Sequence, residues 1–243
     1  MEFKYLESLG RDLRDAILRA LREYTEALTL AIVMAIVLRT FVFAAYKISN
    51  MSMEPGMKLG DFVIGYKLPY GVHIPFTNIR LGHSTPRRGD ILVFRCPKEK
   101  DLSCVKRVVG LEGDRIEIKG KRLILNQKPA SYTKEDESLE PYFRSAAQLV
   151  VLRERSVGGA HKILISDDRQ DSNFGPYIVP PRHVFMLGDN RDFSEDSRHW
   201  GAVPIEAIES RLVWVWFSIE WSHLPDGDYS SRVRWDRIFS APH

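Results

Sequence analysis

The sequence predicts a mainly β protein, in which an N-terminal amphipathic arm and a single transmembrane helix precede an antiparallel β-sheet domain with a smaller inserted β-rich region. Three observations predict this arrangement. Apolar residues recur at helical spacing in the first 25 residues, a nearly uncharged apolar stretch follows, and the rest of the chain is rich in short β-branched or aromatic runs. Gly, Pro, Asp and Asn separate those runs, which is typical of an all-β domain.

The arm, residues 1–25, has an apolar stripe at steps of three and four residues, the spacing of one face of an amphipathic helix. The stripe consists of Leu6, Leu9, Leu13, Ile17, Leu21 and Tyr24. Its polar flanks carry Arg11, Arg14, Arg19 and Arg22. By the positive-inside rule these arginines predict a cytoplasmic N-terminus and export of everything after the apolar stretch. A solvated helix that simply extends the span is the alternative interpretation of the arm.

The predicted transmembrane helix covers residues 26–46. Ala27–Tyr46 contains twenty residues with one charge, Arg39, and a helix of that length spans about 30 Å, the hydrocarbon thickness of a bilayer. A cleavable signal peptide is one alternative, but its apolar core is usually about 7–15 residues long and begins nearer the N-terminus. A buried core helix is the other alternative. Because Arg39 lies in the last third of the stretch, its long side chain can reach the membrane interface, and we predict a single span.

The β-sheet domain is predicted in two parts, residues 47–125 and 182–243. The expected strands after the span are residues 62–66, 90–95, 104–110, 115–125, 149–153, 162–166, 183–187 and 212–219. Within 115–125 the pattern predicts a tight hairpin around Gly120. Residues 126–181 are more polar, and we expect them to form an inserted accessory region.

Composition and motif searches exclude several function classes. The formal net charge is +3, and the 35 Lys and Arg residues are spread among 32 acids, which does not predict a nucleic-acid partner. The chain has two cysteines and neither a C-x-x-C nor an H-E-x-x-H pattern. The acidic run at 189–196 lacks the framework of a calcium loop, and no G-x-S-x-G is present. We therefore expect no metal and no cofactor.

Three polar segments remain as candidates for chemistry: residues 49–55, 103–114 and 188–198. Taken singly, they read as an ordinary loop, a strand with an exposed lysine, and a turn. They contain S-M-E-P, K-R-V-V-G-L-E-G-D and G-D-N-R-D-F-S-E-D-S-R, in that order, behind an N-terminal anchor that ends in L-R-T-F-V-F at 38–43. In this combination the chain resembles bacterial type I signal peptidase (leader peptidase), from about Leu38 to the C-terminus, with 126–181 the least constrained part.

The resemblance implies a serine–lysine dyad in the β-sheet domain, with Ser52 as the nucleophile and Lys106 as the general base. A lysine works as a base near neutral pH only when its ammonium form is disfavoured, and burial among apolar groups has that effect. Val105, Val108 and Val109 are apolar neighbours of Lys106 in the sequence. Acyl transfer through an ester on Ser52 is the reaction that the resemblance implies.

The resemblance also implies roles for residues around the dyad. The oxyanion donors would be the Ser52 backbone N–H and the side chain two residues earlier, where the family usually has Ser or Gly and this chain has Asn50. An Asn amide can also donate. The usual Thr after the proline is replaced by Gly56. Ser194 would orient Lys106, with a supporting ion pair between Asp196 and Arg198, while residues 189–191 would hold the turn.

The implied substrates are the signal peptides of exported preproteins, bound as an extended strand and cleaved at small-x-small sites. Candidate pocket-wall residues are Ile48, Met53, Val93 and Val105, with core packing an equal alternative for Val93. The implied location is the plasma (inner) membrane, single-pass, with the catalytic domain on the extracytoplasmic (periplasmic) face. Because Ser52 lies six residues past Tyr46, it is at most about 20 Å from the end of the predicted span. The lipid bilayer is therefore an expected partner.

Other interpretations stay open at this stage. A pilin-processing peptidase shares the general layout, and a membrane-anchored β domain that binds exported peptides without catalysis belongs to a different class. A self-cleaving repressor protease would carry an N-terminal helix-turn-helix instead of a span. Trp214 and Trp216 are expected on one sheet face, either at a membrane interface or half-buried. Cys96 and Cys104 either pair in an oxidising compartment or remain free thiols.

Overall fold

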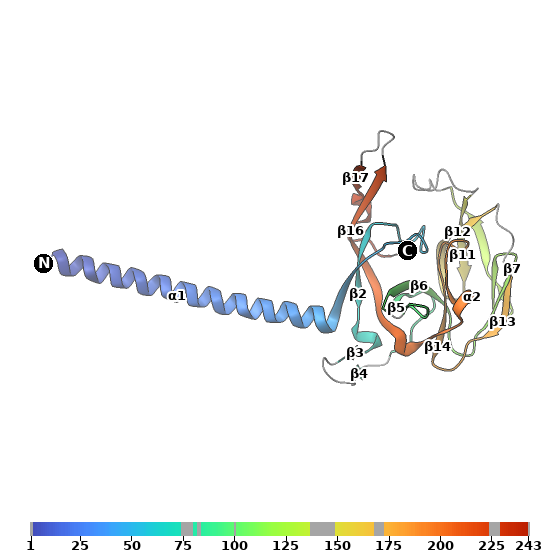
Figure 1. Ribbon diagram of the computed structural model, residues 1–243, viewed down its shortest axis with the longest axis horizontal. Coiled ribbons are helices and arrows are strands. Elements are labelled where there is room, and N and C mark those ends of the chain that lie inside the picture. Colours follow the sequence, from blue (N-terminus) through green and yellow to red (C-terminus); the bar gives the residue numbers. More distant parts are fainter. Residues whose placement is uncertain are drawn as a thin grey trace. The chain divides into compact units, whose positions relative to one another are not determined.

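The computed structural model describes residues 2–73, 80–81, 84–99, 101–136, 149–167, 173–223 and 229–242 (Figure 1). The chain divides into two compact units, a helical unit that ends at Val42 and a β unit that begins at Phe43. All pairings between the named strands are antiparallel. The mainly β fold class is confirmed.

The helical unit consists of α1 (Glu2–Val37), which continues as a π-helical turn, η1 (Leu38–Val42). Within the described residues, Ala16–Val42 is the one helical stretch long and apolar enough to cross a membrane, with a mean hydropathy of 1.8 in its most apolar window and no buried residue there. The expected stripe of the arm begins at residues whose side chains lie outside the described part. The arginines of the arm that are described, Arg14, Arg19 and Arg22, are exposed.

The predicted helical span is too long at its C-terminal end. Residues 43–46 belong to strand β1 (Phe43–Lys47), which pairs with β2 (Asp61–Tyr66) in the register Phe43↔Tyr66 to Lys47↔Phe62. Their backbone groups bond to a neighbouring strand and so cannot continue the helix. The apolar pattern ran on to Tyr46 because a half-buried strand and a membrane helix both use apolar residues.

The largest sheet has eight strands in the order β1-β2-β16-β5-β6-β14-β15, with β17 paired to β16. Its remaining strands are β5 (Ile91–Arg95), β6 (Ser103–Gly110), β14 (His183–Leu187), β15 (Val203–Pro204), β16 (Ile208–His223) and β17 (Tyr229–Val233). Figure 1 shows the end of β16 and β17 lying side by side as one long hairpin. This sheet includes strands from residues 47–125 and from residues 182–243.

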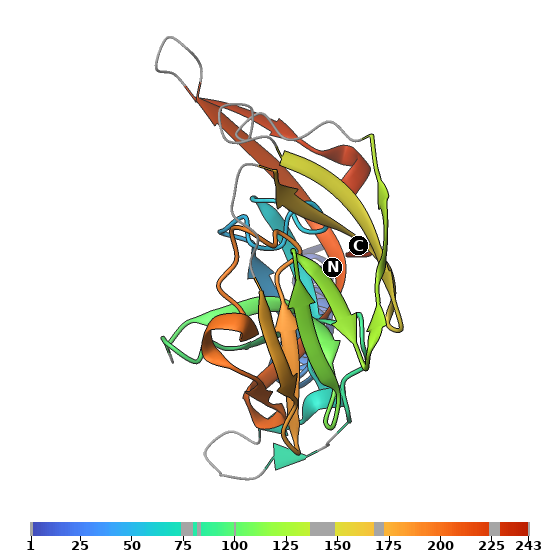
Figure 2. The ribbon, with the colours of Figure 1, turned by 90° about the vertical axis from the view of Figure 1, so that its right-hand side faces the viewer.

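Three smaller sheets accompany it, and Figure 2 shows their green and yellow strands beside the main sheet. One consists of β13 (Phe174–Ile178), β7 (Arg115–Lys119), β8 (Arg122–Leu125) and β9 (Lys128–Pro129). Another consists of β10 (Ser131–Lys134), β11 (Leu149–Ser156) and β12 (Gly159–Ser166). The third pairs β3 (Val72–His73) with β4 (Arg80–Leu81).

The predicted hairpin around Gly120 is confirmed, because β7 and β8 pair through Lys119↔Arg122. Gly120 and Lys121 both have positive φ, 53° and 64°, as a two-residue hairpin turn requires. The accessory region was expected to begin at residue 126, but the strand pairing places an earlier segment in the accessory sheets. Since β7 pairs with β13, the accessory sheets already begin at Arg115.

Strand β5 lies at the centre of the core. Ile91 and Val93 pack into one buried apolar cluster, and Leu92 and Phe94 pack into another on the opposite face. Alternate side chains of a strand point to opposite faces, so the β5–β6 pair is covered on both sides. That packing fixes the strand on which Lys106 lies.

Short helices complete the β unit: η2 (Leu68–Tyr70), α2 (Ser197–Trp200), η4 (Ile205–Ala207) and η5 (Trp235–Arg237). Cys96 and Cys104 form a disulfide, so of the two alternatives the paired one is confirmed. Trp214 and Trp216 lie on one face of β16, 52% and 42% exposed, with Val215 fully buried between them. The expected common face for Trp214 and Trp216 is therefore found, and their partial exposure is compatible with both interpretations of that face.

Candidate active site

Ser52 lies in the loop between β1 and β2, which we call the nucleophile loop (Met51–Met57). Turn hydrogen bonds from the Glu54 N–H to Met51 O and from the Met57 N–H to Met53 O close the loop on itself. Asn190 attaches it to the third motif, since its backbone N–H donates to Ser52 O at 3.1 Å and its Nδ2 donates to Met51 O at 3.1 Å. Ser52, the predicted nucleophile, is therefore held by the turn bonds of its own loop and by Asn190.

Lys106 lies on β6 opposite Leu92 and is 4% exposed. Its Nζ donates to Ser52 Oγ at 2.7 Å and to its neighbour's carbonyl, Val105 O, at 2.9 Å. Burial lowers the pKa of Lys106 from 10.5 to about 8, although the nearby Asp196 and Asp189 carboxylates act in the opposite direction. The structure thus brings together two residues 54 positions apart, and one of them is a lysine poised to lose its proton.

Asn50 contacts Ser52 through the oxygen of its side chain. Asn50 Oδ1 accepts from the Ser52 backbone N–H at 3.2 Å and from Ser52 Oγ at 2.8 Å. The expectation from the resemblance was a donating amide at this position. In the structure the side chain is an acceptor that uses the very N–H expected to stabilise an oxyanion.

Ser194 is buried at the site and has no hydrogen bond to Lys106 among the described residues. Its Oγ donates to Glu195 O at 3.4 Å, whereas the Nζ of Lys106 uses Ser52 and Val105. A Cβ added at Gly188 would lie 2.1 Å from Ser194 Oγ and 2.5 Å from Ser52 O. Ser194 and the nucleophile loop therefore pack against the same glycine, where a side chain would not fit.

Asp196 and Arg198 form the expected ion pair, with Arg198 Nη2 to Asp196 Oδ2 at 2.7 Å. The same carboxylate accepts from the Gly188 N–H at 3.0 Å and caps α2 through the Arg198 N–H. Burial would raise the pKa of Asp196, but the hydrogen bonds and charge of Arg198 outweigh it and the pKa is lowered. Asp196 is thus a fixed negative charge near Lys106.

The third motif, residues 188–198, also makes ion pairs with distant strands. The sequence did not predict these contacts. Asp189 makes a bidentate pair with Arg107, the residue after Lys106, at 2.8 and 2.7 Å. Arg191 pairs with the fully buried Glu154 of β11 at 2.8 Å. These ion pairs, together with Asn190, join β6, β11 and the nucleophile loop. The signal in the sequence was the run of four polar residues, 189–192, shortly after a buried strand.

The four candidate pocket-wall residues form one group. Ile48, Met53 and Val93 belong to a single buried cluster, and the partly buried Val105 packs against it. Val93 is completely buried and packs in the core. The cluster adjoins the dyad because Met53 follows Ser52 and Val105 precedes Lys106.

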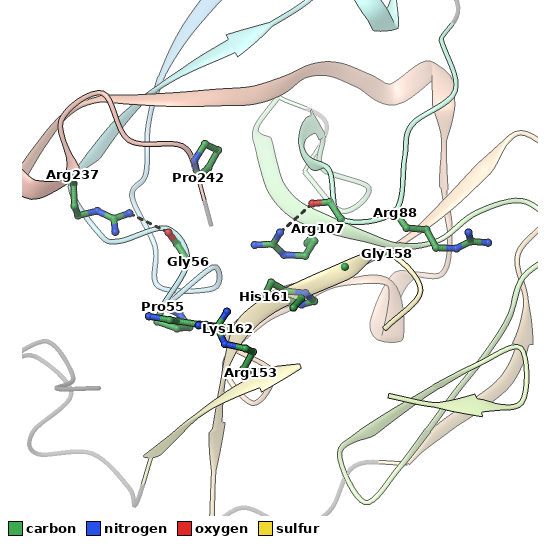
Figure 3. Close-up of a pocket in the computed structure, with 13 residues that line it drawn as sticks. Pro55, Gly56, Arg88, Arg107, Arg153, Gly158, His161, Lys162, Arg237 and Pro242 are labelled. Carbon is green, nitrogen blue, oxygen red and sulfur yellow. Dashed lines mark hydrogen bonds between the residues drawn. The ribbon is translucent and has the colours of Figure 1, made fainter. Parts of the chain in front are cut away.

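A separate cavity of about 560 Å³ begins at Pro55 and Gly56, at the far end of the nucleophile loop. Figure 3 shows Arg107 and His161 in its wall and Arg237 donating to Gly56 O. Ser52 and Lys106 do not line it. Its arginines pair with carboxylates: Arg88 with Asp114, Arg107 with Asp189, Arg153 with Glu135 and Arg237 with Asp61.

Metal chemistry has no candidate site among the residues described. No group of three or more His, Cys, Asp or Glu residues in that part of the chain is arranged to hold an ion. The carboxylates of the third motif pair with arginine or lysine side chains instead.

Comparison with known proteins gives one consistent result. The family model described as signal peptidase, peptidase S26, matches residues 21–217, most of the chain. The signal peptidase I of Pseudomonas fluorescens is 34% identical over 224 residues, covering 84% of this chain and 76% of that protein. The signal peptidase I of Pseudomonas aeruginosa is 32% identical over 236 residues, covering 89% and 78%.

Among solved structures, a crystal structure of a signal peptidase I from Enterococcus faecalis V583 is 27% identical, with a TM-score of 0.35, and covers 53% of this chain and 97% of that one. The sequence comparisons confirm the family that the three motifs predict. This chain belongs to the signal peptidases of the peptidase S26 family and is a serine peptidase.

Proposed function

We propose that the protein is a membrane-anchored serine endopeptidase that removes signal peptides from exported preproteins through a Ser52–Lys106 dyad. The observation that carries this proposal is the 2.7 Å contact between Lys106 Nζ and Ser52 Oγ in a buried setting. With a pKa of about 8, roughly one tenth of Lys106 is neutral at pH 7, enough for a general base.

The proposed reaction is a two-step acyl transfer. Neutral Lys106 takes the proton of Ser52 Oγ while Oγ bonds to the scissile carbonyl carbon, and the resulting ammonium returns that proton to the leaving amine as the C–N bond breaks. In the second step Lys106 takes a proton from water, which attacks the ester. The ester C–O bond breaks, and Ser52 Oγ regains a proton. No metal or cofactor enters either step.

Three groups of residues are proposed to support this chemistry. The Ser52 backbone N–H and the Asn50 side chain stabilise the oxyanion. Asp196 and Arg198 fix a charge near Lys106, and Ser194, which packs against Gly188 as the nucleophile loop does, helps to orient Lys106.

The proposed substrate is an extended peptide with small residues before the scissile bond. The cluster containing Ile48, Met53, Val93 and Val105 is apolar and almost entirely buried, and we propose that its edge beside the dyad accepts small side chains. Small-x-small cleavage sites suit such a surface.

The proposed anchor is the apolar helix Ala16–Val42, with its arginine-bearing start on the cytoplasmic side and the β unit outside. The disulfide between Cys96 and Cys104 supports an oxidising, extracytoplasmic compartment. The exposed indoles of Trp214 and Trp216 suit a position at the membrane interface.

The test is cleavage of a purified preprotein by the full-length protein in detergent. Ser52→Ala and Lys106→Ala are expected to abolish release of the mature protein. Matched controls are Ser131→Ala and Lys119→Ala, both at exposed positions of the accessory strands, which should cleave normally. Normal cleavage by Lys106→Ala would disprove the dyad. A wild-type protein that binds the preprotein without cleaving it, and a Ser52→Ala variant that binds it equally well, would favour a binding module.

A further inference from the structure

The side-chain amide of Asn50 has only one orientation compatible with its contacts. Its terminal atom faces the Ser52 backbone N–H at 3.2 Å and Ser52 Oγ at 2.8 Å. A backbone N–H can only donate, so the atom that faces it must be the acceptor Oδ1 rather than Nδ2. The hydrogen-bond chemistry therefore assigns the orientation.

This orientation sets the direction of the Ser52 proton. Lys106 Nζ donates to Ser52 Oγ, and Oγ donates its single proton to Asn50 Oδ1. Proton transfer to the base needs the reverse direction, with the Oγ proton directed at a neutral Nζ. In the substrate-free protein Asn50 thus competes with Lys106 for the same proton, and the chain of hydrogen bonds is polarised away from catalysis.

Asn50 Oδ1 also accepts from the Ser52 backbone N–H, the group proposed to stabilise the oxyanion. The substrate carbonyl oxygen and Asn50 Oδ1 are both acceptors without a proton, so they cannot share the Ser52 N–H in the transition state without repulsion. Asn50 is exposed, while Ser52 is buried. An exposed amide can rotate about its Cβ–Cγ bond, a soft and roughly two-fold torsion. A half turn replaces Oδ1 by the donor Nδ2.

We propose that Asn50 is a substrate-triggered amide switch: it holds the Ser52 hydroxyl and N–H as an acceptor in the free protein and, after rotation, donates to the oxyanion. The substrate carbonyl triggers the rotation because it takes the Ser52 N–H from Oδ1. Loss of that contact frees the Ser52 proton for Lys106. This inference rests on the dyad function proposed above and adds to it a role for Asn50 in controlling the Ser52 proton.

The first test compares side chains that keep one half of the switch. Asn50→Asp keeps the shape and the accepting oxygens but cannot donate, Asn50→Ala has neither property, and Asn50→Ser can still donate. The expected kcat falls about a hundredfold or more in the Asp and Ala variants, the scale of losing one oxyanion donor. KM stays within a few-fold, and the Ser variant stays within about tenfold of wild type.

A matched control and a pH series separate the donor effect from added charge. Asn173 also accepts a backbone N–H, from Gly120 at 2.9 Å, so Asn173→Asp is the same change at a site away from the dyad and should cleave normally. The new carboxylate of Asn50→Asp also raises the pKa of Lys106, and this part of the loss disappears at pH 10. A deficit that persists at pH 10 supports the switch, whereas full recovery there, or normal kcat for Asn50→Ala, overturns it.

The second test observes the amide itself. Full-length protein with ¹⁵N-labelled asparagine and serine, in detergent micelles, is treated with a peptide aldehyde that ends in a small residue and adds to Ser52 as a tetrahedral adduct. The Asn50 side-chain amide protons and the Ser52 N–H are both expected to shift in the wild type, and Ser52→Ala, which cannot form the adduct, should abolish the shift of the Asn50 amide protons. A shift of the Ser52 N–H alone overturns the switch and leaves the dyad intact. An aldehyde that leaves Ser52 unmodified in a protein that does not cleave overturns the proposed function itself.

Discussion

Replacing Lys106 with Met should stabilise the protein near neutral pH while abolishing cleavage, because the buried ammonium opposes folding. The pKa of Lys106 is about 8 in the folded protein against 10.5 in an unperturbed lysine. That difference corresponds to roughly 3 kcal/mol against folding below pH 8, where both the folded and the unfolded chain carry the proton. Methionine has a similar length and no charge.

The sign follows from where the two states titrate. Between pH 8 and 10.5 the folded protein has lost the proton and the unfolded chain still holds it, so the wild-type stability rises with pH in that window. The methionine variant lacks this dependence. Relative to the variant, the wild type should therefore gain about 2.5 kcal/mol between pH 7 and pH 10.

The two hydrogen bonds of Nζ, to Ser52 and to Val105, are lost at both pH values. At about 1 kcal/mol each, they reduce the advantage of the variant to about 1 kcal/mol at pH 7 and reverse its sign at pH 10.

The assay is urea unfolding of the full-length protein in detergent, followed by tryptophan fluorescence, because all five tryptophans lie in the β unit. Wild type, Lys106→Met and the exposed control Lys119→Met are compared at pH 7 and pH 10. A stability difference between wild type and Lys106→Met that is the same at both pH values would refute a lowered pKa for Lys106. It would also remove the physical reason for Lys106 to act as a general base.

Further outcomes follow from the same geometry. The kcat/KM of the wild type should rise about tenfold per pH unit up to about pH 8 and then level off, as a base with that pKa requires; a flat profile between pH 6 and 8 contradicts it. Asn190→Ala removes one side-chain bond to the nucleophile loop and should lower kcat/KM about tenfold with little change in unfolding midpoint, measured on the same peptide substrate. Joint replacement of Cys96 and Cys104 by serine opens a loop closed across a sequence separation of 8 and should cost about 2–3 kcal/mol in urea unfolding, against a wild-type control under reducing conditions that shows the same loss. A cysteine at Val157, which is 63% exposed, should react with an impermeant maleimide added outside intact cells, whereas one at Arg14 should not; the opposite labelling would reverse the proposed topology.

The fold was predictable wherever local pattern decides structure. The β-branched runs predict the strands, and Gly120 between two such runs predicts a hairpin, whose turn residues Gly120 and Lys121 have the positive φ that it requires. The predicted element boundaries were wrong where pairing with a strand distant in sequence determines the structure. Residues 43–46 continue the apolar pattern of the helix but pair with β2, and β7 joins the accessory sheet because it pairs with β13 more than fifty residues later. No local pattern contains such pairings.

For the site, the motifs locate the proposed nucleophile and base, and the structure brings Ser52 and Lys106 within hydrogen-bond distance. Residue types do not determine the direction of a hydrogen bond. An asparagine can donate or accept, and only the position of the Ser52 N–H shows that Asn50 accepts. Ser194 illustrates the same point: a serine hydroxyl can rotate toward different acceptors, and here it donates to Glu195 O rather than bonding to Lys106.

The third motif, taken singly, is predicted as a turn, and in the structure Asp189, Arg191 and Asp196 are buried and paired. Buried ion pairs are poor sources of stability, since desolvation offsets their attraction and apolar replacements of equal volume are often as stable. Their value here is positional. Each pair is directional and joins segments that are distant in sequence, so an apolar replacement of such a pair should leave folding intact while releasing the strand or loop that it aligns. Stability and catalysis are therefore expected to separate at these residues, which a purely structural role would not allow.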